Sequence, residues 1–574
     1  APTPGHTFGF WHRKPKKKSL IDFEALSTEA VQASDNSMPT ISPDWEYDVL
    51  IPWGTPINPW SGCKAYEGDP NTRPTAAEQE QMIGIGHDGM WLYPANLPYV
   101  LRYEARIGRE LPAKARRRVL SNRAGILCVN HEYGTNPHLL GKNMPESLED
   151  VRLSQAAHGV SVVAIGKGWR GEWKLLPSHR NRRITVNTDV EFSGPAAHSA
   201  SLANAAGNRP KGTVNNCGSG PTPWGTYLTC EENFNGYFGS TDENGAFGGF
   251  DALQDKGYAR YGFSAGGFAY GWEQFDPRFD MSNPDYANES NRFGWCVEID
   301  PFDPYAKPVK RTALGRFKHE GAAVQELPDG RVAVFMGDDQ AGDYCYKYES
   351  NMPWRKAVRH GLSPLDDGKL YVARFLEGAS AEDGKGTGEW IELTASDPVI
   401  RAAGLTTQDQ VLIYARLAAD AVGATPMDRP EWSTIGTKGQ IYWTMTNNSG
   451  RREAIEACPI ASNSDGHIIE TRDTSATTFE WSLFVLARNT RRPDAPPTDG
   501  STEILPGFEY TAPEDGGANV FTDPDAAYAD PFGRLYIGTD GGQPDGLEDQ
   551  LLVFDTYTGE YKRILCGVVN DEIT

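Results

Sequence analysis

Oxygen-bearing side chains and one thiol recur beside short apolar runs that are separated by glycine turns. Glu320 precedes a turn at 328–331 and an apolar run at 332–335, and Glu431 stands in the same place before the run at 441–443. Carboxylate oxygens are the ligands that hard cations such as Ca²⁺ prefer. The repeat therefore predicts a metal site, and its candidate ligands are Glu132, Cys217, Glu231, Glu232, Glu320, Glu431, Asp523 and Asp525.

Cys217 is the single soft ligand in this set. One sulfur among carboxylates favours a transition metal such as iron beside calcium. A lone cysteine is more often a small buried apolar residue, and that alternative stays open on residue type alone. Because 216–221 is rich in glycine and turn-forming residues, we expect the thiol on a loop at the mouth of a channel.

Arg429 and Glu431 are the candidate catalytic pair. Residues two apart in an extended segment point to the same face, and a guanidinium matches phosphate oxygens in a bidentate geometry. A structural ion pair is the competing interpretation. The same alternation allows only one of Glu231 and Glu232 to face the metals. Asp88, Asp338 and Asp339 also stand at strand ends, where metal binding and turn capping are both open.

The elements that position these residues are short strands in repeated units, which predict an all-β propeller with a minority of helix. Each unit would point its first residues at one central channel. We expect an N-terminal extension over 1–40 and a single propeller domain with inserted loops over 41–574. The segment 96–120 is expected to be partly helical, and 233–292 and 378–424 to be loops or small elements. The last residues, 570–574, resemble the opening of one further copy, so the last blade is expected to be incomplete.

Composition restricts the partners. The formal net charge of −22 disfavours binding of nucleic acid, which needs an excess of Lys and Arg. The same charge is equally compatible with an acidic surface that only keeps the protein in solution. No apolar run approaches the length of a membrane span, and no charged-then-apolar leader with a cleavage site is recognised at the amino terminus. The eight cysteines contain no CxxC pair. We expect a monomer that binds small molecules, and a basic run at 13–18 that is a solvated tail.

Five motifs together resemble the PhoX-type alkaline phosphatases. They are NNCGSGPTPWGTYLTCEEN at 215–233, VNHEYG at 129–134, FKHEGAAV at 317–324, RPEW at 429–432 and the segment 523–541. The resemblance implies a six-bladed propeller that encloses Fe(III) and Ca²⁺, hydrolyses phosphomonoesters and is exported by the twin-arginine route to the periplasm or the cell exterior. It also implies that Cys217 binds iron, that Glu132, Glu320, Glu431 and Asp525 bind iron or calcium, and that Arg429 holds the substrate phosphate.

Two other functions remain open at this stage. A calcium-dependent lactonase or esterase propeller would also place carboxylates around the channel, but it needs neither Cys217 nor Arg429. A non-catalytic binding platform would use calcium only for stability and its inserted loops for a partner, since a fold alone does not decide function. Buried like charges without cations would be costly, which argues against the platform.

Overall fold

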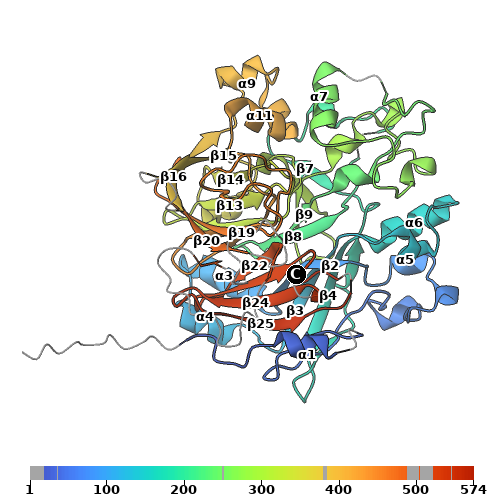
Figure 1. The fold of residues 1–574 in the computed structure, drawn as a ribbon. Helices are drawn as coiled ribbons and strands as arrows, with labels where there is room; N and C mark the ends of the chain where they lie inside the picture. The colour runs from blue at the N-terminus through green and yellow to red at the C-terminus, as the bar shows by residue number, and fades with distance from the viewer. Residues whose placement is uncertain are drawn as a thin grey trace, which may run out of the picture.

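The computed structural model describes residues 19–34, 37–207, 209–248, 251–378, 384–487, 503–504, 521–543, 546–569 and 571–574. Over these residues the chain is mostly β-structure arranged in four sheets (Figure 1). The basic run at 13–18 lies outside the described residues. No helix among the described residues is long and apolar enough to cross a membrane.

Two of the sheets are built by residues 87–311. The first contains β2 (His87–Pro94), β3 (Ala124–His131), β4 (Gly159–Lys167) and β5 (Trp173–Leu175), with β6 (Arg182–Ile184) paired to β4. The second has the order β7 (Glu191–Ser193), β11 (Val309–Arg311), β10 (Cys296–Ile299), β9 (Tyr227–Glu231) and β8 (Asn216–Pro221). Apart from the parallel pair of β7 and β11, neighbouring strands are antiparallel, as expected for units joined by short turns.

The largest sheet joins two antiparallel units edge to edge. One unit is β12 (Ala323–Glu326), β13 (Val332–Gly337), β14 (Cys345–Ser350), β15 (Gly368–Glu377) and β16 (Lys385–Glu392); the other is β17 (Pro430–Ile435), β18 (Ile441–Met445), β19 (His467–Asp473) and β20 (Thr478–Leu486), and β21 (Glu503–Ile504) pairs with β20. The fourth sheet contains β22 (Pro524–Ala529), β23 (Arg534–Thr539), β24 (Gln550–Asp555), β25 (Tyr561–Cys566) and β1 (Thr40–Ile41).

Five first strands surround a common axis. Strand β2 contacts β8, β8 contacts β12, β12 contacts β17, and β17 contacts β22. The rings of Trp91 on β2 and Tyr528 on β22 meet edge to face at 5.8 Å, which brings the last strand back to the first. This radial order is the one that the repeats predict. The described strands supply five such units, so six blades are not established by them.

The C-terminal segment 571–574 enters the centre of this arrangement (Figure 1). The backbone N–H of Ile573 donates to the carbonyl of Thr539 at the end of β23. At Gly538 a Cβ would lie only 1.7 Å from the oxygen of Ile573, so the two backbones approach as only glycine allows. The segment therefore lies against β23, close to the start of β2.

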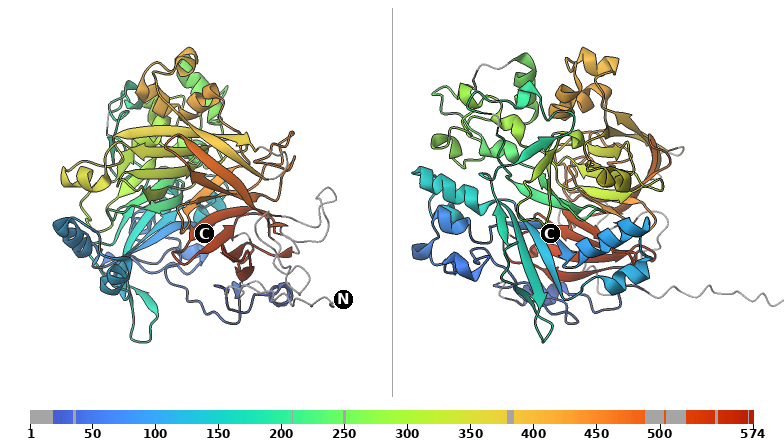
Figure 2. Two further views of the ribbon diagram at one scale, coloured as in Figure 1. Left: turned by 90° about the vertical axis from the view of Figure 1, so that its left-hand side faces the viewer. Right: turned by 180° about the vertical axis from the view of Figure 1, so that it is seen from behind.

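The helices decorate the outside of the sheets. They are α1 (Thr28–Gln32), α2 (Ala76–Gln79), α3 (Leu97–Ile107), α4 (Ala113–Val119), α5 (Asn136–Leu140), α6 (Leu148–Ala157), α7 (Ala252–Arg260), α8 (Trp354–Arg359), α9 (Pro398–Ala402), α10 (Gln408–Ile413) and α11 (Ala415–Val422). Figure 2 shows α3 and α4 beside the last sheet, where Arg117 lies over the ring of Phe532. The helical segment at 96–120 and the small elements at 233–292 confirm the sequence predictions. The prediction for 378–424 holds for α9, α10 and α11 but is wrong for β16, which is a strand of the largest sheet.

Part of the expected N-terminal extension packs on the fourth sheet. Leu26 and Val31 form an apolar cluster with Leu547 and Cys566, and Thr40 pairs with Cys566 in the sheet. Burying such side chains removes apolar surface from contact with water, which favours the packed arrangement. The described residues of 19–41 are therefore bound to the sheet rather than free of it.

Candidate active site

A β-bulge occurs at the same place in four of the inner strands. In β2, His87 pairs with His131 and Met90 with Val129, so three steps along β2 match two along β3. The same shift separates the first two pairs of β8, β17 and β22. A bulge turns side chains out of their normal alternation and is common beside active sites. The first residues inside the four bulges are Asp88, Cys217, Glu431 and Asp525.

The start of β12 carries the equivalent extra residue. His319 bridges to Asp338, and Ala323 pairs with Phe335, so four steps match three. The first residue in this interval is Glu320. Five equivalent positions thus present one inward ligand ring, which we call the bulge ring: Asp88, Cys217, Glu320, Glu431 and Asp525.

A left-handed backbone conformation precedes four of these positions, and it is strained at the three that are not glycine. The residues just before the first paired residue of β2, β8, β17 and β22 have positive φ angles: Gly86 at 61°, Asn215 at 49°, Arg429 at 54° and Asp523 at 51°. A positive φ is uncommon outside glycine and gathers at functional sites, where the surrounding structure must hold it. The repeated conformation shows that the chain enters each of these bulges in the same way.

The second strands of the units supply a second set of carboxylates. In each unit, one residue of the second strand pairs with the start of the inner strand, and the next residue in the sequence is a carboxylate. These are Glu132 after His131, Glu232 after Glu231, Asp339 after Asp338 and Asp540 after Thr539. We call Glu132, Glu232, Asp339 and Asp540 the strand-end ring.

The two rings meet in one cluster, whose members are buried except for the exposed Asp540. Ligand atoms lie within 4.8 Å of one another in the groups Asp88, Cys217 and Glu320; Glu132, Cys217 and Glu232; and Glu232, Glu320 and Asp339. Glu572 from the C-terminal segment joins Asp88 and Glu132 in a further group. Cys217 therefore contacts both rings, and its Sγ is within hydrogen-bond distance of Glu320 Oε1.

Burial makes this cluster costly without cations. It raises the pKa values of Glu132, Glu232, Glu320 and Glu431, and neighbouring carboxylates raise them further. Burial also raises the pKa of Asp88 to about 6. Oδ1 of Asp525 is buried and has no hydrogen-bond partner among the described residues. Buried carboxylates in such density need protons or bound cations, so the donor set fits a metal centre.

Two cationic side chains border the cluster. The guanidinium of Arg429 donates from Nε to Asp339 Oδ1 at 2.7 Å and from Nη2 to Asp339 Oδ2 at 2.8 Å, and Nη2 lies 2.9 Å from Glu431 Oε1. Lys318 Nζ donates to Asn233 Oδ1 at 2.9 Å, and Asn233 in turn donates to Glu232. The structural ion pair of Arg429 and Glu431 is therefore present, and the role of the pair in binding a substrate phosphate stays a prediction.

Glu231 and Glu232 point in opposite directions, as strand alternation predicts. Glu231 is fully buried and pairs with Lys310 Nζ at 2.7 Å, and it accepts the backbone N–H groups of Gly294 and Trp295. Glu232 faces the cluster. The structure therefore does not bring Glu231 together with the other candidate ligands.

Two further candidate ligands, Asp523 and Cys217, lie in positions that differ from those expected. Asp523 accepts a hydrogen bond from Asn447 Nδ2 at 2.8 Å and occupies the position equivalent to Arg429 rather than to Glu431. Cys217 lies within strand β8 and is 4% exposed, so the expectation of a loop at a channel mouth is wrong. Glycine and proline in 216–221 serve a bulged strand, because bulges use glycine where another backbone approaches closely.

Asp540 and Glu572 are the cluster members that the sequence analysis did not propose. Asp540 closes a second strand in the same way as Glu132, so alignment of the repeats was the available signal. Glu572 lies in the segment that resembles a further copy, but no turn or strand follows it to mark its register. Asp88 and Asp339, which sequence left undecided, both belong to the cluster.

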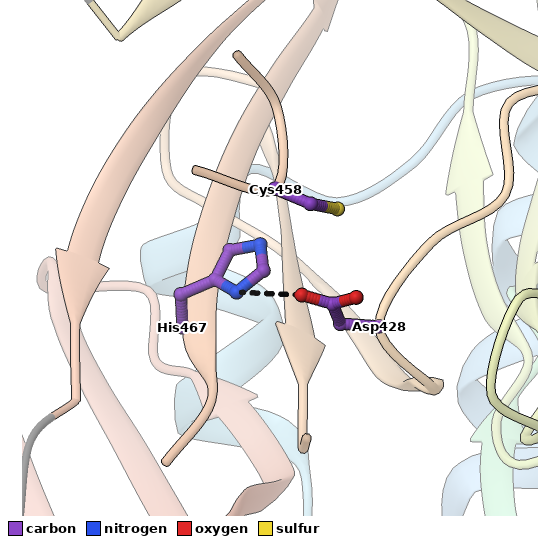
Figure 3. Close-up of side chains that lie close together, drawn as sticks. All are labelled: Asp428, Cys458 and His467. Carbon is purple, nitrogen blue, oxygen red and sulfur yellow. Dashed lines mark ion pairs between the residues drawn. The ribbon is translucent and has the colours of Figure 1, made fainter. Parts of the chain in front are cut away.

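A second buried group lies directly behind Arg429. Figure 3 shows Asp428, Cys458 and His467 turned toward one another. Asp428 pairs with Arg451 and accepts Asn463 Nδ2 at 3.1 Å. Burial lowers the pKa of His467, and its Nε2 donates to the carbonyl of Ala457 at 3.1 Å.

The polar atoms of this second group are thus held by protein partners. Asn463 also lies 3.2 Å from Nδ1 of His467, and Arg451 Nη2 donates to the carbonyl of Pro426 at 2.6 Å. The group fixes the residue that precedes the strained Arg429. It therefore holds the backbone from which the Arg429 side chain extends.

The site defines the chain as a metal-dependent hydrolase for anionic substrates. The chain belongs to the PhoX family of alkaline phosphatases, which are metal-dependent phosphoric monoester hydrolases: the family model "Alkaline phosphatase PhoX" matches residues 26–573. The chain is also similar to a solved structure of Pseudomonas fluorescens PhoX in complex with vanadate, a transition state analogue. The identity is 38%, the match covers 96% of this chain and 90% of that one, and the TM-score is 0.80.

A gluconolactonase from Xanthomonas campestris matches at 10% identity with a TM-score of 0.23, over 72% of this chain and 73% of that one. That likeness is too low to carry an argument, so nothing in it supports a lactonase. No curated protein matches the chain. The family result confirms the resemblance seen in the sequence motifs and the phosphomonoesterase function.

Proposed function

We propose that this protein hydrolyses phosphomonoesters at the buried cluster, with Fe(III) and Ca²⁺ as its cofactors. The observation that carries the proposal is the convergence of the bulge ring and the strand-end ring around one thiol, with Arg429 at the edge. Isolated carboxylates at strand ends are common. Repeated bulges that aim one ligand from each unit at the same place are not explained by turn capping.

The donor set fits both cations. Cys217 offers the soft sulfur that favours iron, with Glu320 beside it. Glu132, Glu232 and Asp88 offer oxygen atoms suited to calcium. We assign Glu431 and Asp525 to the same centre. Bound cations would supply neutralisation of the phosphoryl charge and polarisation of its oxygens.

Arg429 orients the substrate in this proposal. Its Nε and Nη2 are fixed by Asp339 and Glu431, while Nη1 has no hydrogen-bond partner in the part of the chain that the structure describes. Its side chain is 29% exposed, so an incoming phosphate can reach the guanidinium. Donors fixed in advance stabilise developing charge without reorganisation. Glu431 contributes by holding the guanidinium while it faces the cluster.

The test combines metal content with turnover on one sample. The protein is stripped with a chelator and reloaded with Ca²⁺ alone, Fe(III) alone, or both. We expect hydrolysis of a chromogenic phosphomonoester only when both are bound. Full turnover after complete metal removal would reject the proposal.

The neighbouring pair Glu231 and Glu232 provides a matched control for the ligand assignment. Glu232→Gln should reduce bound metal, whereas Glu231→Gln should leave the metal content closer to that of the wild type, because Glu231 faces Lys310. Equal metal loss in both variants, measured by elemental mass spectrometry on folded protein, would contradict the assignment.

We also propose that 571–574 takes the sixth inner position of a six-bladed, single-domain propeller over 41–574. The position of Glu572 beside Asp88 and Glu132 supports this, as does the bond from Ile573 to Thr539. If so, Glu572→Gln should reduce bound metal, whereas Glu548→Gln, at an acidic residue just before β24, should not.

Location and assembly are further proposals that rest on the family. We propose a monomer that acts in the periplasm or outside the cell. Light scattering of the purified protein tests the first, and phosphatase activity in fractionated cells that express the natural gene tests the second. A stable dimer, or activity confined to the cytoplasm, would overturn the respective proposal.

A further inference from the structure

A cavity of about 390 Å³ opens beside the metal cluster. Glu132 and Asn233 line its inner side, and Tyr133, Phe268 and Tyr270 line the rest together with several amide side chains. This volume is in the range of small-molecule sites. The residues that line it come from the segment 132–143 that follows β3, from Asn215 before β8, and from the inserted segment 233–292.

The cavity is continuous with the cluster through shared residues. Glu132 belongs to the strand-end ring and groups with Cys217 and Glu232. Asn233 donates to Glu232 and accepts from Lys318. A phosphoryl group at the cluster would therefore place the rest of its ester at or near this opening.

The walls of the cavity are fixed in advance. The rings of Tyr237 and Tyr270 stack with centroids 4.3 Å apart and an interplanar angle of 11°. Asn136 Nδ2 donates to the carbonyls of Ala269 at 3.1 Å and Tyr270 at 3.2 Å, and Ala269 has a positive φ of 62°. A backbone held in this way costs free energy that the surrounding contacts must supply.

Phe268 is exposed to solvent, but contacts with Gly236 hold it in place. Its side chain is 53% exposed, while its backbone N–H donates to the carbonyl of Gly236 at 2.7 Å. The ring lies against Gly236, where a Cβ would come within 2.0 Å of it. Tyr133 is likewise 46% exposed. The two residues present apolar aromatic surface at the cavity, where a ring can stack.

No lysine, arginine or histidine lines the cavity in the described part of the chain, and Glu132 is the charged residue among its lining. A leaving group with its own negative charge would find no partner there. We propose that this cavity binds the alcohol portion of the substrate and favours neutral aromatic groups, with Phe268 as a specificity-determining residue. The inference rests on the proposed function of the cluster.

Binding of two non-hydrolysable ligands to the metal-loaded protein tests this inference. Phenylphosphonate and methylphosphonate share the phosphoryl-like group and differ in the aromatic ring. By calorimetry, we expect the wild type to bind phenylphosphonate about three- to tenfold more tightly. In Phe268→Ala that ratio should fall to about one or two, with the affinity for methylphosphonate unchanged. Phe268→Leu keeps apolar bulk without a ring and should give an intermediate ratio.

Phe532→Ala is the matched control, because Phe532 is 52% exposed and does not line the cavity. Its ratio should equal that of the wild type. An unchanged ratio in Phe268→Ala, a wild-type ratio near one, or no binding of either phosphonate would overturn the inference.

Turnover separates this inference from the proposed function. Hydrolysis of both phenyl phosphate and glycerol 2-phosphate with an unchanged binding ratio in Phe268→Ala would reject the cavity assignment alone. A ratio that falls as expected in a protein without any phosphatase turnover would support the cavity as an aromatic phosphonate site and reject the proposed function.

Discussion

Arg429 and Asp339 face each other through two parallel hydrogen bonds of 2.7 and 2.8 Å, although they lie 90 positions apart in the chain. Burial alone would raise the pKa of Asp339, but the charge and hydrogen bonds of Arg429 hold it below its usual value. The carboxylate is therefore charged, and it fixes the plane of the guanidinium at the edge of the metal cluster. A fork-shaped donor held by two bonds cannot be replaced by a point charge.

Arg429→Lys should accordingly retain the metals and lose activity. We expect kcat/KM for phosphomonoesters to fall about 100-fold, as for the loss of a preorganised donor to a developing anion. Elemental analysis and steady-state kinetics on the same sample check this. Arg331→Lys is the control, since Arg331 is similarly exposed at 31% but pairs with Asp329 and Glu349, which do not belong to the cluster. Activity near that of the wild type in Arg429→Lys would remove Arg429 from the site.

Asp428→Asn should weaken the support of Arg429. Asp428 pairs with Arg451 and binds Asn463, so the neutral amide leaves a nearly buried guanidinium poorly paired, at a cost of about 1–3 kcal/mol. Movement of Arg429 should then lower kcat/KM about tenfold or more in assays well below the unfolding temperature, with unchanged metal content. Glu389→Gln, at an exposed pair with Arg374, should change neither. Lower stability with full activity would show that this group serves folding only.

Gly218→Ala should move the candidate ligands Cys217 and Glu320 apart. A Cβ at Gly218 would lie 1.6 Å from the backbone oxygen of Glu320, so the inner strands β8 and β12 must move apart. We expect a loss of about 1–3 kcal/mol, as for overpacking elsewhere, together with reduced metal content. Thermal unfolding and elemental analysis measure both effects. Gly542→Ala is the control, because no described atom lies within 4 Å of its added Cβ. Full metal loading in Gly218→Ala would contradict the close packing of the ring.

His158 should make stability depend on pH. Burial lowers its pKa from 6.5 to about 4, so the unfolded chain takes up a proton at higher pH than the folded protein does. The stabilisation is present above about pH 6.5 and is lost as the pH falls toward 4, by about 3 kcal/mol in total.

His158→Gln removes this dependence. The difference in unfolding free energy between the wild type and the variant should shrink by about 2 kcal/mol between pH 7 and pH 5, as measured by denaturant unfolding at each pH. His360→Gln, at an exposed histidine, should give a constant difference. A constant difference for His158→Gln as well would show that His158 does not titrate in this way.

The repeats predicted the inner strands well because each one carries its ligand and its turn locally. Strand alternation also predicted that only one of Glu231 and Glu232 faces the cluster, but it left open which one. The bulges were not predictable, since an extra residue in one strand is visible only when its partner strand is known. For the same reason, Cys217 was expected on a loop: glycine and proline around it indicate a turn as readily as a bulged strand.

The sequence also did not predict which residues far apart in the chain contact each other. Nothing near Arg429 in the sequence identifies Asp339, and nothing near Glu231 identifies Lys310, which neutralises it from β11. Asp540 needed alignment of all the units, and Glu572 lies in 571–574, which we propose as the sixth inner position. Local patterns thus predicted ligand types, while tertiary pairing decided which of them meet.

The most direct test compares the wild type with Cys217→Ser for bound metal, visible absorption and phosphomonoester turnover in the same preparation, with Cys63→Ser as a control at a partly exposed thiol. We predict iron and calcium, visible colour and turnover in the wild type and in Cys63→Ser. Cys217→Ser should lose iron, colour and most of its turnover together. A wild type without bound metal that hydrolyses phosphomonoesters, or a Cys217→Ser variant that keeps iron and full activity, would contradict the account.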